Sequence, residues 1–225
     1  GYGSGALIGL IGAVGGCIVS TRLMQRFTIK AYPEMKEAVN AEGNEENISF
    51  KSEGNIFMRI LNSVLDGGKS GVSIGVAIIP GVLVISTFVM MLTFGASKSG
   101  EYTGAAYEGV ALLPYLANKI SIVFEWLFGF THAELVSFPI TSLGAVGAAL
   151  SLIPKFAAEG FIDGNAIAVC TAMGMCWSGF LSTHTAMLDS LGYRKLISKA
   201  ILAHTIGGFV AGIVAHWAFV LISLI

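Results

Sequence analysis

Charged residues are scarce in this chain, and their scarcity is its most informative property. Asp, Glu, Lys and Arg together make up 12% of the 225 residues, about half of their share in an ordinary soluble domain. A soluble domain of this size could not cover its surface with so few charges. Hydrophobic residues make up 54% of the chain, so the composition predicts an integral membrane protein.

Other absences narrow the function further. The net charge of −1 offers no basic surface for phosphates, which excludes nucleic acid as a partner. The three cysteines form no CxxC pair and lie in apolar runs, so we interpret them as buried hydrophobic residues: Cys17, Cys170 and Cys176. No Ser-His-Asp order, P-loop or dinucleotide fingerprint occurs. We therefore expect neither an enzyme with catalytic residues nor a bound cofactor.

The few charges are unevenly placed, and this divides the chain. About half of them lie between Arg22 and Lys69, whereas long stretches elsewhere carry none. A spanning helix needs about 20 apolar residues, and four segments meet this requirement: 4–23, 70–97, 164–188 and 200–225. We predict three regions: a spanning helix over 1–24, a cytoplasmic loop and interfacial helix over 25–69, and a helical membrane domain over 70–225.

The first two spans, and the segment at 55–66 between them, carry marks of local structure. The first contains Gly5-x-x-x-Gly9 and Gly12-x-x-x-Gly16, a spacing that lets membrane helices approach closely. Residues 55–66 place apolar side chains on one helical face, but the stripe is too short to span and suits a helix lying in the interface. We expect this helix to end at Asp66-Gly67-Gly68. In the second span, Pro80 predicts a kink.

Residues 109–154 are apolar but interrupted. They contain Pro114, Asn118, Lys119 and Glu125, then the polar group Thr131-His132-Ala133-Glu134. This pattern fits either two poor spanning helices or a re-entrant hairpin with its tip at mid-depth. Backbone of the second kind is tolerated only where protein or a cavity surrounds it. A carboxylate inside the hydrocarbon region is a functional hypothesis by default, although an ordinary surface loop is the alternative for Glu134.

Basic residues predict the orientation. They flank the region 22–69 and the loop 190–199, so we expect both to be cytoplasmic in a multi-pass protein of the cell membrane. Both the hairpin and a pair of full spans give an even number of crossings between them. The rule therefore does not choose between the two.

The segment from Trp177 to Asp189 is unusually polar for a span. On an unbroken helix Ser178, Ser182, Thr185 and Asp189 share one stripe, and His184 lies on another face. These residues line a cavity, or their hydroxyls bond back to their own helix. Gly179 and the Ser/Thr run are also able to break the helix and free backbone groups for a ligand. His204 and His216 are twelve residues apart and do not face one way, so we expect hydrogen bonds to a neighbouring helix rather than a metal site.

The order of these elements resembles the C-terminal half of the concentrative nucleoside transporters and the related Gate-domain (nucleoside-recognition) membrane proteins. The resemblance is strongest at 56–87 and 129–134. In that family a hairpin tip carries a Ser-x-Glu-like motif, which matches His132-Ala133-Glu134 here, and its carboxylate binds the nucleoside sugar. A discontinuous helix follows with an Asn-Phe-Ser-Ser motif, which matches Gly179-Phe180-Leu181-Ser182.

The resemblance implies an all-α membrane protein with four spanning helices, a re-entrant hairpin at 109–154 and an interfacial helix, forming half of a secondary transporter. It also implies that the span over 1–24 joins a first half missing from this chain and that 70–225 is a Gate-like transport domain. Such a half moves a small polar solute, nucleoside-like or other, by alternating access as a symporter. We expect the coupling Na⁺ or H⁺ site to lie outside this chain, and we expect a second half or second chain, as in a homo-oligomer, to complete the unit in the lipid bilayer. The candidate substrate-binding residues are Thr131, His132, Glu134, Ser178, Ser182, Thr183, His184 and Thr185. The alternatives are a non-transporting scaffold of the Gate-domain type and an intramembrane metal-site protein.

Overall fold

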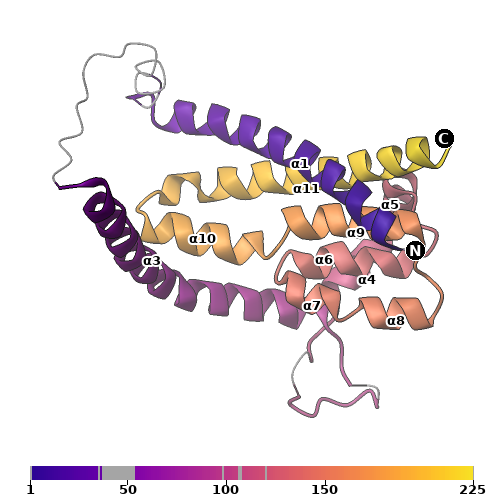
Figure 1. Cartoon of the computed structure of the whole chain (residues 1–225). Coiled ribbons are helices and arrows are strands. Elements are labelled where there is room, and N and C mark those ends of the chain that lie inside the picture. Colours follow the sequence, from indigo (N-terminus) through magenta and orange to yellow (C-terminus); the bar gives the residue numbers. More distant parts are fainter. Residues whose placement is uncertain are drawn as a thin grey trace.

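The computed structural model describes residues 2–34, 36, 54–97, 99–105, 108–119 and 121–224. Over these residues the chain is a bundle of helices without a strand, which confirms the all-α prediction (Figure 1). Four helical stretches within the same ranges are long and apolar enough to cross a membrane: Tyr2–Ala31, Ile56–Thr93, Gly164–Ser190 and Arg194–Ser223. Most of the predicted cytoplasmic loop, from residue 37 to 53, lies outside the described residues.

Glycines bring three long helices together. Helix α1 (Tyr2–Ala31) packs on α9 (Gly164–Cys176) and on α11 (Ile197–Ser223). A Cβ on Gly12 would lie 2.5 Å from the carbonyl oxygen of Ala211 and 3.0 Å from the Cβ of Ala172. Gly5 and Gly9 meet α9 in the same way. The predicted small-residue spacing therefore forms the buried face of α1, which runs parallel to α9 and antiparallel to α11.

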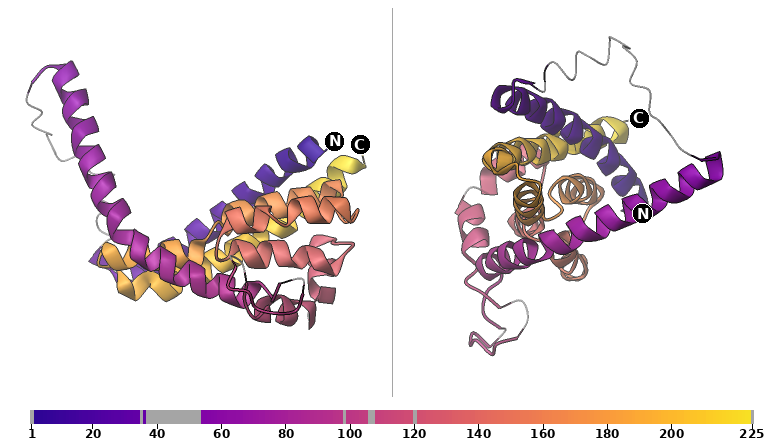
Figure 2. Two further views of the ribbon diagram at one scale, coloured as in Figure 1. Left: turned by 90° about the horizontal axis from the view of Figure 1, so that it is seen from below. Right: turned by 90° about the vertical axis from the view of Figure 1, so that its left-hand side faces the viewer.

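The two basic regions lie at one end of this bundle. The rings of Tyr32 and Tyr193 meet edge to face with centroids 5.6 Å apart, and the Lys199 ammonium lies 5.7 Å from the centre of the Phe27 ring. The start of α1 and the end of α11 lie together at the opposite end (Figures 1 and 2). The shared end of the basic regions agrees with the predicted topology, and its cytoplasmic location stays a prediction.

Helix α3 (Ile56–Thr93) corrects one prediction. Asn55 begins it, because its side chain accepts a hydrogen bond from the Met58 amide at 2.9 Å. The helix then continues through Asp66-Gly67-Gly68 and through Pro80 for 38 residues. The separate interfacial helix ending at residue 66 is therefore wrong. Two glycines cost about 1 kcal/mol each in a helix, which the hydrogen bonds of a continuous backbone offset in apolar surroundings.

Residues 112–158 form short helices, none of which is long enough to span: α4 (Leu112–Lys119), α5 (Ser121–Phe128), 3₁₀ helix η1 (Ala133–Val136), α6 (Ser137–Ser142), α7 (Val146–Leu150) and α8 (Ile153–Ala158). The alternative of two full spanning helices is thus wrong for the described residues. The chain reverses at Gly129, whose φ of +63° favours glycine, and again at 143–145. Two reversals leave three short passes, of which the second and third pack on α9 through α6 and α7.

One core fixes these short passes to the long helices. Phe128, Leu135, Met173 and Trp177 are almost fully buried at its centre. Asn165, at the start of α9, donates to the carbonyl oxygens of Phe128 at 2.8 Å and Gly129 at 2.9 Å. The first reversal is therefore tied to the end of the bundle where α1 and α9 begin.

Candidate functional site

The third span, Gly164–Ser190, is broken near its middle. Helix α9 ends at Cys176 and α10 (Phe180–Ser190) begins after Gly179, whose φ is +76°. The side chain of His204 donates from Nε2 to the Cys176 carbonyl, which the break leaves without its helical partner. Trp177 donates from Nε1 to the His204 carbonyl at 3.2 Å. The side chain and the backbone of His204 on α11 thus both bind the end of α9.

The turn between α6 and α7 packs directly on this break. The Gly179 amide donates to the Ser142 carbonyl at 2.9 Å, and a Cβ on Gly179 would lie 3.0 Å from the Gly144 carbonyl oxygen. From the other side, Ser86 of α3 donates to that same Gly144 oxygen at 3.3 Å. A Cβ on Gly144 would lie 2.6 Å from Val89. The ends of α6, α7, α9 and α10 therefore converge beside α3.

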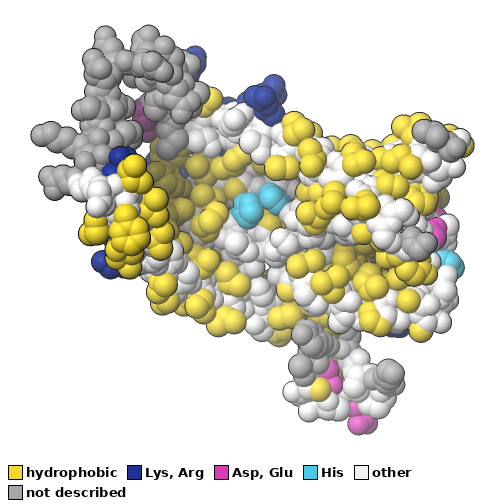
Figure 3. Space-filling view, in the orientation of Figure 1, with side chains coloured by type: hydrophobic (Ala, Val, Ile, Leu, Met, Phe, Trp, Pro, Cys, Tyr) yellow, Lys and Arg dark blue, Asp and Glu magenta, His cyan; other side chains and the backbone are white. Residues whose placement is uncertain are grey.

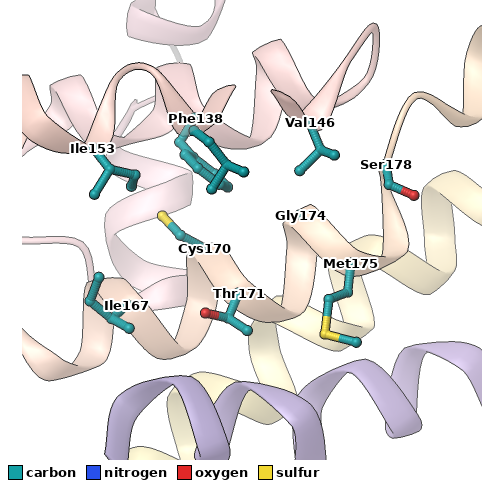
Figure 4. A pocket seen from close by; sticks show the side chains of 10 residues that line it. Phe138, Val146, Ile153, Ile167, Cys170, Thr171, Gly174, Met175 and Ser178 are labelled. Atoms are coloured by element: carbon teal, nitrogen blue, oxygen red, sulfur yellow. The ribbon is translucent and has the colours of Figure 1, made fainter. Parts of the chain in front are cut away.

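A cavity of about 560 Å³ lies between α9 and the short helices α6, α7 and α8, and it reaches the break at Ser178 (Figure 4). Its walls are largely apolar, with Phe138, Val146 and Ile153 facing α9 in Figure 4. Polar groups come from Thr171 and Ser178. An apolar chamber with a few hydroxyls is the usual form of a small-molecule site.

The three predicted residues of the first polar group lie at the far end of α9. Thr131 and Glu134 are exposed, and the half-buried His132 stacks on Phe161 with ring centroids 4.3 Å apart. The length of α9 separates this end from the break, about 20 Å at 1.5 Å per residue. In the described residues the structure does not bring Glu134 beside Ser182, contrary to our expectation that the two meet at mid-depth.

The predicted hydroxyls of α10 bond mostly within their own helix. Ser182 is buried, and its hydroxyl donates to the Gly179 carbonyl at 2.8 Å, as does that of Thr183 at 2.9 Å. Thr185 donates to Leu181 at 2.7 Å. Of the two alternatives for these hydroxyls, hydrogen bonding to the backbone of their own helix therefore describes all three residues. Ser178 differs because it is exposed and lines the cavity.

His184 lies apart from that cavity. Its ring contacts the ring of His204 with centroids 4.5 Å apart, and both line a second cavity of about 370 Å³ between α1, α10 and α11. His204 and His216 each bond to α9, to Cys176 and to Asn165 respectively, which confirms the expected hydrogen bonds to a neighbouring helix. No group of three metal-ligating side chains occurs in the part of the chain that the structure describes.

Sequence reasoning missed the residues that position the break. Ser142 and Gly144 lie in an otherwise apolar segment of the sequence, and nothing near them in the sequence marks them as partners of Gly179. Asn165 was also missed, although an amide at the start of an otherwise apolar span was a usable signal. No family model matches the chain, and no curated protein or solved structure matches it.

Proposed function

We propose that this chain is half of a secondary transporter, with the solute bound where the broken span meets the turn at 143–145. The observation that carries the proposal is the Gly179–Ser142 contact between two interrupted elements within the bundle. Interrupted helices of this kind mark solute sites in transporters, because their ends carry backbone groups outside the regular helical hydrogen bonding. In this proposal residues 133–158 form the re-entrant hairpin, with its tip at 143–145.

The cavity of Figure 4 supports a choice of solute. Phe138 and the aliphatic side chains around it favour a flat or apolar body, and Ser178 and Thr171 offer hydroxyls to its polar groups. A nucleoside has both parts, and the resemblance to the concentrative nucleoside transporters favours the same class. A second half, from a second chain in a homo-oligomer or from the same protein, closes the site.

The test is uptake of radiolabelled uridine by proteoliposomes that contain the full-length protein. Gly179→Ala forces a side chain into the left-handed region and toward the Gly144 carbonyl, so we expect uptake to fall at least tenfold. Gly192→Ala is the matched control, because Gly192 has a φ of +79° and no atom within 4 Å of its Cβ position. Equal uptake by the two variants, at equal reconstitution, contradicts the proposal.

The same assay locates the solute. Ser178→Ala removes one hydrogen bond, worth about 1 kcal/mol, so we expect uridine binding to weaken about fivefold. Ser190→Ala at the exposed end of α10 is its control. For Glu134→Gln the resemblance predicts a tenfold loss, whereas the separation of Glu134 from the break predicts less than a twofold change. We expect the smaller effect.

A non-transporting scaffold is the second candidate. It is favoured by the hydroxyls of Ser182 and Thr183, which both bond to Gly179 and offer the solute no free donor in this arrangement. A scaffold predicts no uridine uptake by wild-type protein and no difference between the Gly179 and Gly192 variants.

A further inference from the structure

Two histidines meet inside the spanning bundle, away from the cavity of Figure 4. His184 of α10 and His204 of α11 approach with ring centroids 4.5 Å apart and planes inclined at 60°. His204 stands seven residues after the start of α11, which is about 10 Å along the helix. Both rings are half-buried. Ionisable side chains at such a depth mark ion or proton pathways more often than packing.

Hydrogen bonding defines where the proton of His204 lies. Because a carbonyl oxygen only accepts, the bond to Cys176 requires hydrogen on Nε2 of His204. In the neutral ring Nδ1 is then an acceptor. Nδ1 of His184 is buried and has no hydrogen-bond partner in the described part of the chain. A buried polar atom without a partner is uncommon and asks for an explanation.

His184 and His204 line a chamber through which a proton is able to reach them. The cavity of about 370 Å³ extends from both histidines past Ser20 and Thr21 toward the end of the bundle that carries the basic residues. A smaller cavity of about 210 Å³ adjoins it, sharing Cys17, Ser20 and His204. Figure 3 shows histidine side chains accessible from outside on this face, among apolar and uncharged atoms.

Among the described residues, none that lines the chamber carries a formal charge, and few other titratable groups lie near it. Cys17 lines it and Cys176 lines the adjoining one; His216 faces Asn165 instead. The charged residues on the elements packed around the pair are all exposed: Arg22, Arg26 and Lys30 on α1, Arg59, Asp66 and Lys69 on α3, and Asp189, Arg194, Lys195 and Lys199 around the α10–α11 loop. Asp189 is paired with Arg194.

We propose that His184 and His204 form a binding site for one proton that stabilises the break in the third span. The proton adds to a ring nitrogen of the pair, making one imidazolium beside one neutral imidazole that accepts from it. A second proton is opposed by the first, since two like charges at this distance in a poorly solvated site repel strongly. The imidazolium strengthens the bond to the Cys176 carbonyl, where the negative end of the α9 dipole lies.

In the proposed transporter this makes the proton the coupling ion, carried within this chain. That step rests on the proposed function, whereas proton binding and its effect on the break do not. The arrangement couples the charge of the pair to the same break on which Gly144 packs. The geometry thus supplies a link between proton and solute sites on one helix.

The first experiment measures protonation by NMR of ¹⁵N-histidine-labelled full-length protein in lipid nanodiscs between pH 4 and 8. We expect one proton to be taken up by the pair, with both rings responding together. His204→Gln retains an N–H for the Cys176 carbonyl and removes the joint response, as does His184→Gln. His216→Gln, which keeps a donor to Asn165, leaves it intact. Independent titration of the two rings, or none, overturns the proposal.

The second experiment reads the break itself. A single cysteine at Ser178, in a protein with Cys17, Cys170 and Cys176 replaced by alanine, is labelled with a maleimide at pH 5 and pH 8. Rates are divided by those of the same protein carrying His204→Gln, which cancels the pH dependence of the thiol. We expect the ratio to be at least threefold lower at pH 5. An unchanged ratio contradicts the inference.

Uridine uptake then separates the two proposals. Joint titration and pH-dependent labelling without any uptake mean that the transporter proposal fails and the proton site stands. Uridine uptake without joint titration of the two histidines means that the transporter proposal stands and the proton site fails.

Discussion

The glycine face of α1 allows a sharp test of what holds the bundle together. Gly12 and Gly15 are neighbours in the interior of the same helix, so replacing either by alanine gains the same helix propensity, about 1 kcal/mol. They differ only in what a new methyl group meets. At Gly12 it lies 2.5 Å from the Ala211 carbonyl oxygen and 2.7 Å from the Ala215 Cβ. At Gly15 it lies 3.3 Å from the Val214 methyl groups.

The size of the expected destabilisation depends on whether the atoms that the new methyl group meets are able to move. The obstacle at Gly12 is the backbone of α11, so α1 must separate from α11 and from Ala172 of α9 to admit the methyl group. Overpacking of this kind costs about 1–3 kcal/mol, and part of that is lost dispersion along both interfaces. The Val214 side chain needs to shift by only a few tenths of an ångström. We therefore expect Gly12→Ala to be less stable than Gly15→Ala by about 1–3 kcal/mol.

The assay is reversible unfolding of the purified protein in mixed micelles, with the free energy of unfolding compared between the two variants. Because both gain the same propensity, their difference isolates the contact with α11. Equal free energies of unfolding would refute the argument that close backbone approach, rather than glycine's flexibility, explains these residues.

Two further predictions concern the turns outside the long helices. Asn165→Leu leaves the Phe128 and Gly129 carbonyls without donors, so we expect a loss of about 1–3 kcal/mol in the free energy of unfolding, with Asn165→Gln as the conservative comparison in the same unfolding assay. Hydrogen bonds from the Thr103 hydroxyl, and from the Thr103 and Gly104 amides, hold the pKa of Glu108 below its ordinary value. Because the folded-state pKa is lowered, the loop is stabilised above the ordinary pKa of 4.5 and loses that stabilisation as the pH falls through the lowered value. Hydrogen exchange at the Thr103 and Gly104 amides, corrected for intrinsic rates, should show protection at pH 7 that Glu108→Gln lacks, and protection that persists under acid in wild-type protein would contradict this.

The long helices were predictable because the membrane acts on every residue of a span alike. The absence of charge from residue 1 to residue 21 placed α1, and its glycine spacing identified the buried face. The break in the third span was also readable, since Gly179 and the polar residues after it contrast with the apolar run before Cys176. Each of these signals is local to one segment.

The site itself depends on contacts between segments, which no single segment encodes. Gly144 matters because Val89 of α3 leaves no room for a Cβ at that turn, and Ser86 of α3 donates to the Gly144 carbonyl. The resemblance pointed to Glu134, yet the fold places it at the exposed end of the short helices. Gly67 and Gly68 misled in the opposite direction, because a local helix-ending signal worth about 1 kcal/mol per residue did not outweigh the continuous backbone hydrogen bonding of α3.

Because α3 is one uninterrupted helix, it connects two distant parts of the described chain. Gly81 packs directly on Ala186 of α10, where a Cβ on Gly81 would come within 2.8 Å of the Ala186 Cβ. From Gly81 the helix extends about 12 Å to Val89 at the turn and about 37 Å to Ile56 at its other end, at 1.5 Å per residue. The Ile56 side of α3 is therefore about three times longer than its Val89 side, and Figure 2 shows the helix bent along its course. One continuous helix thus connects the buried turn at Gly144 with the polar segment before α3, and its contact with α10 lies nearer to the turn.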